Sequence, residues 1–188
     1  IEMCGADPGE VDAMVSDIED MDRIIGQFLA FSKVDGDEAL ETMDLAELAN
    51  EVAGFYARRG VPITVLATTA AQAQVRPQAL RRAVTNLIEN ALHYAGHPPE
   101  LTVGMLDGRP MIEVLDRGPG IPAEQTEKVK RPFTRLESAR SNTKGSGLGL
   151  AIVDRIVRGQ HGEFRLLPRE GGGLRASILL RGHTKSLS

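Results

Sequence analysis

Apolar residues recur at helical spacing near the start of the chain. Between residues 11 and 33 the steps alternate between three and four, at Val11, Met14, Ile18, Met21, Ile25 and Phe28. This narrow seam is typical of a helix that packs against other helices, whereas a surface helix on its own domain shows a wider apolar stripe. The pattern therefore favours a helical bundle or a dimer seam over residues 11–33.

A polar stretch separates this helix from the rest of the chain. Residues 34–44, VDGDEALETMD, are polar and contain glycine, which is typical of a linker. We expect a boundary near residue 36, so that residues 1–36 form a helical segment and residues 37–188 form a separate domain.

Helical and strand patterns alternate in the second part of the chain. Asp44, with Glu47 three residues later, predicts a capped helix that Gly60 ends. The sequence ITVLA at 63–67 has the β-branched composition of a strand. A second helix is predicted over residues 77–95, because a proline opens it and a glycine follows it.

The remaining chain predicts paired strands and one more helix. LTVGML and MIEVLD flank Asp107 and Gly108, a turn pair typical of a hairpin. A helix is expected from the glycines at 145–149 to about His161, followed by the strands EFRLLP and LRASILL. Strands paired as hairpins, with helices on one face, predict an α+β fold in the form of a two-layer sandwich.

Composition narrows the class of protein. The chain of 188 residues is 41% hydrophobic, which suits one soluble domain with an appendage. The net charge of -4 argues against a nucleic-acid partner, because binding to phosphates needs a basic surplus. The single cysteine, Cys4, excludes an internal disulfide framework and favours a reducing compartment. Because the chain starts with Ile1 rather than Met, we expect it to be a piece of a longer protein.

Candidate chemistry begins on the helix predicted over residues 77–95. Asn86 and Asn90 lie four residues apart and share a face, which His93 and Tyr94 continue. Asparagines beside a buried stripe indicate a functional role, and solvated surface residues are the alternative reading. His93 and His97 have the spacing of metal ligands, but the helix ends before His97, which argues against zinc.

Glycines follow a strand and precede a helix further along. Asp116 ends a predicted strand and leads into Gly118 and Gly120, which fit a Rossmann phosphate loop, although a hairpin strand precedes them and no repeated βαβ pattern surrounds them. In GSGLGL, residues 145–150, glycines open a helix. They expose backbone amides that attract anions, or they form a flexible hinge.

Four of these segments, in this order, resemble a known family. NLIENALHYA, DRGPGIP, RPFTRLESAR and GSGLGLAIV are similar to the N, G1, F and G2 boxes of bacterial two-component sensor histidine kinases. The resemblance extends over nearly all of residues 37–181 and implies the ATP-binding fold shared with gyrase-type ATPases. ATP and Mg²⁺ are the implied cofactors.

The resemblance implies roles for individual residues. Asp116 would accept a hydrogen bond from the amine of adenine, and the amide oxygen of Asn90 would bind Mg²⁺. Tyr94 and Ile121 would border the base, and the implied ATP site also includes Asn86, His93, Gly118, Gly120, Arg135, Arg140, Gly145, Ser146, Gly147, Leu148, Gly149 and Leu150. The stretch 123–144 would be a lid, although its usual F-x-P-F reads Lys130-Arg131-Pro132-Phe133.

The resemblance also implies partners. Residues 1–33 resemble the end of a dimerisation hairpin with its turn around Asp7-Pro8-Gly9, so we expect a homodimer through these helices. The phosphoryl group would pass to a histidine upstream of Ile1 and then to an aspartate of a response-regulator receiver domain. We expect a cytoplasmic domain of an inner-membrane protein that, by itself, binds ATP without autophosphorylation.

Two alternatives remain at this point. An ATPase of the same superfamily uses a glutamate one turn before the metal-binding asparagine, but position 86 is Asn, which cannot act as a general base, and Glu89 points to another face of the helix. A non-catalytic dimerisation module is the other alternative, and it would not bind Mg²⁺-ATP.

Overall fold

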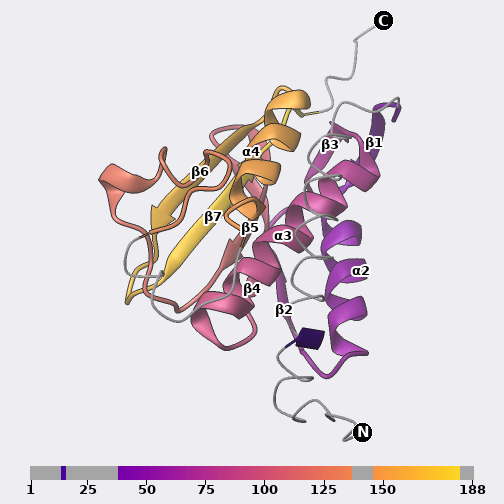
Figure 1. The fold of residues 1–188 in the computed structure, drawn as a ribbon. Helices are drawn as coiled ribbons and strands as arrows, with labels where there is room; N and C mark the ends of the chain where they lie inside the picture. Colours follow the sequence, from indigo (N-terminus) through magenta and orange to yellow (C-terminus); the bar gives the residue numbers. More distant parts are fainter. Residues whose placement is uncertain (1–13, 16–37, 137–145, 183–188) are drawn as a thin grey trace, which may run out of the picture.

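The described part of the chain forms a two-layer sandwich. The computed structural model describes residues 14–15, 38–136 and 146–182, and the helix predicted over 11–33 lies almost entirely outside them. One layer is a five-stranded sheet in the order β2-β4-β5-β7-β6, formed by Thr64–Ala67, Glu100–Leu106, Arg109–Leu115, Leu174–Leu179 and Glu163–Pro168. The other layer contains the helices α2 (Leu45–Ala57), α3 (Pro77–Ala95) and α4 (Gly149–Gly159) (Figure 1).

Pairing within the sheet follows the predicted hairpins. Strand β2 runs parallel to β4, and the other neighbours are antiparallel. Asp107 and Gly108 connect β4 to β5 with φ of 52° and 73°, the positive values that a tight two-residue hairpin turn needs. The hairpin prediction is therefore confirmed.

Local signals define the start of α2 and both ends of α3 as expected, whereas α2 ends at Ala57, three residues before Gly60. The Oδ1 atom of Asp44 accepts a hydrogen bond from the backbone N–H of Ala46 at 2.8 Å at the start of α2. Pro77 is the first residue of α3, and Gly96 ends it with φ of 73° while its N–H donates to Leu92 O.

The core lies between the two layers. The inner face of the sheet contributes fully buried side chains such as Leu101, Val103 and Ile178. The apolar stripe predicted on α3 is buried against them: Leu80, Val84, Leu87, Ile88 and Ala91. This burial confirms the predicted two-layer α+β sandwich.

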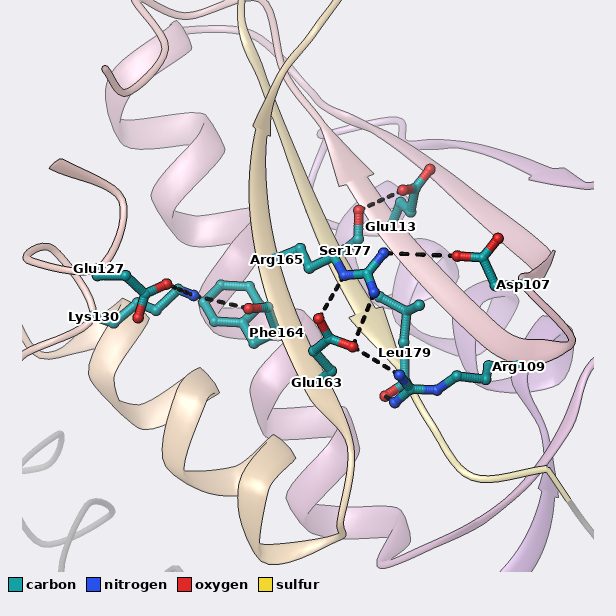
Figure 2. Close-up of polar contacts among 10 residues, drawn as sticks. All are labelled: Asp107, Arg109, Glu113, Glu127, Lys130, Glu163, Phe164, Arg165, Ser177 and Leu179. Atoms are coloured by element: carbon teal, nitrogen blue, oxygen red, sulfur yellow. Dashed lines mark hydrogen bonds and ion pairs between the residues drawn. The ribbon is translucent and has the colours of Figure 1, made fainter. Parts of the chain in front are cut away.

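The outer face of the sheet carries polar contacts (Figure 2) beside the buried side chains of Met111 and Leu179. Ser177 on β7 donates to the buried carboxylate of Glu113 on β5. Arg109 and Arg165 both donate to Glu163, at 2.8 and 2.7 Å. Alternation along these strands therefore directs one set of side chains to the helices and the other set, which includes these polar residues, to the outer face.

One prediction was wrong. The last residues of the expected linker, Glu41–Asp44, form strand β1, which pairs antiparallel with β3 (Gln72–Val75) in a separate two-stranded sheet. The side chains of β1 are exposed or half-buried, so backbone pairing with a distant segment defines this strand. Hydrophobic pattern could not reveal it.

Candidate functional site

The Asp116 carboxylate is held in one orientation. Asp116 follows β5 and is only 8% exposed. Its Oδ1 atom accepts hydrogen bonds from the backbone N–H groups of Gly118 at 2.8 Å and Leu174 at 3.2 Å. Two donors on one oxygen fix the plane of the carboxylate, and the group keeps further acceptor capacity for a ligand.

Glycines allow three backbone segments to meet at this carboxylate. A Cβ atom on Gly118 would lie 3.4 Å from Ala95 at the end of α3. One on Gly120 would lie 3.1 Å from Gly173 O, and one on Gly173 only 2.1 Å from Asp116 O. The end of α3, the loop after β5 and the start of β7 are thus packed backbone against backbone.

Two arginines brace the same region. Arg169 forms an ion pair with Glu100 at 2.7 Å, and its Nη1 donates to Asp116 O at 3.4 Å. Arg117 donates to Glu170 O at 2.8 Å. The predicted site residues did not include these arginines or Gly173, although Arg117 lies in DRGPGIP and Gly173 in GGGLRASILL, both of which resemble family motifs. The signal available for Gly173 was the run of three glycines before the last strand.

The asparagine face of α3 meets the start of α4. The Nδ2 atom of Asn86 donates to Arg82 O at 2.9 Å. Its Oδ1 atom lies 3.7 Å from the position of a Cβ atom on Gly149. Asn90 is half-buried one turn further along, on the way to Ala95 and the Asp116 loop. The helix therefore links the two ends of the site.

The glycine-rich loop before α4 touches the segment that precedes the undescribed residues 137–145. Gly147 has φ of 68°, and a Cβ atom there would lie 3.0 Å from the backbone of both Phe133 and Thr134. Leu148 is fully buried, and its N–H donates to Ser146 Oγ at 3.2 Å. Buried Leu148 thus anchors the loop in the core, while Gly147 permits close contact on the other side.

The remaining predicted residues surround these elements. His93 is exposed and Tyr94 half-buried, and their rings meet edge to face with centroids 4.8 Å apart. Arg140 and Gly145 lie outside the described residues. Three further predicted residues are half-buried: Ile121, Arg135 and Leu150.

A contact between α2 and α3 was not predicted. The hydroxyl of Tyr56 on α2 donates to Glu89 Oε1 at 2.6 Å. Burial, together with this hydrogen bond, raises the pKa of Tyr56. Glu89 is therefore engaged with α2, and it lies on a face of α3 that is rotated away from Asn90.

The fold and this arrangement together define an ATP-binding α/β sandwich. The family model described as "Histidine kinase-, DNA gyrase B-, and HSP90-like ATPase" matches residues 75–183. The chain belongs to this family. The match includes all four motifs and begins at the end of β3.

Individual relatives are sensor kinases. The sensor protein IrlS of Burkholderia pseudomallei is 32% identical over 160 residues, which cover 81% of this chain and 34% of that protein. The structure of a mycobacterial sensor histidine kinase MprB matches with a TM-score of 0.64 at 28% identity, over 77% of this chain and 98% of that one. The histidine kinase domain of the E. coli osmosensor EnvZ matches with a TM-score of 0.61 at 32% identity, over 81% and 96%.

These relatives define the kind of domain. The chain contains an ATP-binding domain of the kind found in sensor histidine kinases. It spans about a third of the length of the curated relative IrlS. Within the described residues, no helix combines the length and apolar character needed to cross a bilayer.

Proposed function

We propose that the chain binds Mg²⁺-ATP between α3 and α4 and supplies its γ-phosphate to a histidine outside this chain. The convergence of Asn86, Asp116 and Gly149 around one helix supports this proposal more than any other observation. The acid at one end can accept a hydrogen bond from a purine base, and the helix start at the other end can bind a triphosphate.

Adenine is the base that fits the acidic end. Asp116 accepts two backbone hydrogen bonds on Oδ1, and its second oxygen would accept from the exocyclic amine of adenine. Guanine presents a carbonyl oxygen there, which a carboxylate repels. Gly118, Gly120, Ile121 and Tyr94 would border the base.

The other end suits phosphates. Helix α4 starts at Gly149, and its first amides would face the anion, together with the loop from Gly145 to Leu150. His93, Arg135 and Arg140 would reach the phosphates.

The side chains on α3 fit a magnesium ion. Because Asn86 donates its amide N–H₂ to Arg82 O, its amide oxygen is directed toward the start of α4. Asn90 shares that face and would be the metal ligand. The described residues contain no group of three or more His, Cys, Asp or Glu side chains that could hold a metal ion. Phosphates and water would therefore complete the shell, as Mg²⁺ usually requires. The ion would neutralise charge on the phosphates.

The residues of this site give little support for ATP hydrolysis, in which water accepts the phosphoryl group. Position 86 is an asparagine, and Glu89, the nearby carboxylate, accepts a hydrogen bond from Tyr56 on α2. A general base must reach the water that it activates. The acceptor would instead be a histidine on a dimerisation hairpin, of which residues 1–36 would be the remainder. A receiver domain would accept the phosphoryl group next, and the whole protein would sit in the inner membrane with this domain in the cytoplasm.

Exchanging Asp116 for Asn tests the proposal directly. Asparagine keeps an oxygen for Gly118 and Leu174 but can present a donor to the base, so Asp116→Asn should weaken Mg²⁺-ATP binding by roughly 10- to 100-fold. The native chain should prefer Mg²⁺-ATP to Mg²⁺-GTP by roughly 100-fold or more. Calorimetric titration measures both.

A matched control is available in the hairpin turn. Asp107→Asn makes the same change at an exposed residue with φ of 52°, where Asn is well tolerated, and should leave binding unchanged. Equal affinity for the two nucleotides, or equal behaviour of the two variants, would refute the proposal. No binding of either nucleotide by the native chain would favour a non-catalytic dimerisation module.

A further inference from the structure

Lys130 stands where the family's motif has an aromatic residue. Its side chain is only 9% exposed, in spite of its charge. Its Nζ atom forms an ion pair with Glu127 Oε1 at 2.6 Å and donates to Phe164 O at 2.9 Å. The same atom lies 5.4 Å from the centroid of the Phe164 ring. Figure 2 shows the lysine side chain reaching from its loop to this ring. A buried ammonium group is stable only with such partners.

Lys130 contacts the sheet at one of its edge strands. Phe164 belongs to β6, which forms one edge of the five-stranded sheet. An edge strand presents backbone groups that no neighbouring strand pairs. Lys130 supplies a donor to one of these carbonyls and covers the face of the Phe164 ring, whose residue is 4% exposed.

The segment from residue 123 to 136 depends on few attachments; we name it the F-box arm. It contains one short 3₁₀ helix, η1 (Ala123–Gln125), followed by turns in which Val129 N–H donates to Gln125 O at 3.0 Å and Arg131 N–H to Lys128 O at 3.1 Å. Val129 is 6% exposed. Val129 and Lys130 are thus adjacent residues that attach the arm to the domain by burial.

The far end of the arm is strained. Phe133 has φ of 59°, although it is not glycine, and the residue is 65% exposed. Such a conformation costs about 1–2 kcal/mol and persists only where the surroundings impose it. The exposed ring contributes little burial, so the backbone on both sides supplies the restraint. Thr134 N–H donates to Arg131 O at 3.3 Å, the Lys130 anchor lies before Phe133, and the backbone of 133–134 contacts Gly147.

We propose that Lys130 is a positioning residue that holds the F-box arm over the glycine-rich loop and thereby strengthens nucleotide binding. It does so by pinning the arm to β6, so that the backbone of 133–134 lies against Gly147. The cation over Phe164 takes the packing role of an aromatic side chain. This inference rests on the proposed function, because it assigns the arm a part in holding the nucleotide.

Removing the charge tests the role of Lys130. Lys130→Met keeps the apolar stem and removes the ion pair, the hydrogen bond and the cation. It should weaken Mg²⁺-ATP binding about five-fold and accelerate amide hydrogen exchange in 131–136 and 146–150. Lys130→Arg should restore both, because it keeps a cation and donors. Lys128→Met is the matched control, since Lys128 is exposed two residues away, and should change neither.

A second variant keeps the test decisive if Lys130→Met unfolds. Glu127→Gln removes only the exposed partner of the ion pair and should raise exchange in 131–136, whereas Glu124→Gln should not. Native-like affinity and exchange in Lys130→Met, or the same losses in Lys128→Met, would overturn the inference. If the native chain binds no Mg²⁺-ATP, the proposed function fails, while exchange in the arm still reports whether Lys130 anchors it.

Discussion

The two ends of the proposed nucleotide site are built in different ways. Around Asp116, backbone segments touch one another, one carboxylate oxygen accepts from two amides, and Gly173 leaves no room for a side chain. Around Gly147, a half-buried loop meets an arm held by turns, one strained residue and a lysine. We therefore expect the proposed base end to be rigid, which would suit selection of one base, and the proposed phosphate end to adjust at modest cost.

The largest effect is expected where the base end is tightest. In Gly173→Ala the new Cβ atom would lie 2.1 Å from Asp116 O at a φ of 108°. The backbone must move, which should lower the free energy of unfolding by about 2–4 kcal/mol and abolish measurable ATP binding. Urea denaturation and nucleotide titration measure these losses.

Gly172→Ala is the control for that substitution. Gly172 has φ of 97°, and a Cβ atom there meets nothing within 4 Å, so only the backbone penalty of about 1–2 kcal/mol should remain. Similar losses in both variants would show that the contact with Asp116 is unimportant and that the base end is not rigid.

A smaller effect is expected at the phosphate end. Gly147→Ala would bring a Cβ atom to 3.0 Å from the backbone of Phe133 and Thr134. The arm can shift, so Mg²⁺-ATP affinity should fall about ten-fold while the free energy of unfolding falls by only about 1–2 kcal/mol. Gly108→Ala has a similar φ of 73° in open space and should lose stability without losing affinity. Equal affinity losses in the two variants would contradict the difference between the ends.

The smallest effect is expected away from both ends, at the contact between α2 and α3. The raised pKa of Tyr56 means that the unfolded chain releases this proton before the folded chain does. The contribution of protonated Tyr56 to the free energy of unfolding is therefore complete below about pH 10, the ordinary pKa of tyrosine. It declines as the pH rises further. Urea unfolding from pH 8 to 11 should show a steeper alkaline loss in the native chain than in Tyr56→Phe, with ATP affinity at neutral pH the same in both. Identical pH dependence of unfolding in the two proteins would show that this contact does not raise the pKa of Tyr56.

Much of the fold could be predicted because its signals are local. Asp44, Pro77 and Gly96 mark helix ends through their own backbone and side-chain chemistry, and Asp107-Gly108 marks a turn. Strand β1 escaped prediction because its polar residues gain a strand conformation only by pairing with β3. The same holds for the site: motif residues could be proposed from their order, but the role of Gly173 became clear only from its distance to Asp116.

The amino-acid sequence by itself determined the helices, the hairpins, the family and the residue types proposed to face a nucleotide, because capping, turn chemistry and periodicity act between residues close along the chain. Only the tertiary structure decided how Lys130 is used, that Glu89 is engaged by Tyr56, and that Asp116 has one orientation. Each of these depends on a partner dozens of residues away, whose distance is set by the tertiary arrangement of helices, strands and loops rather than by local conformation.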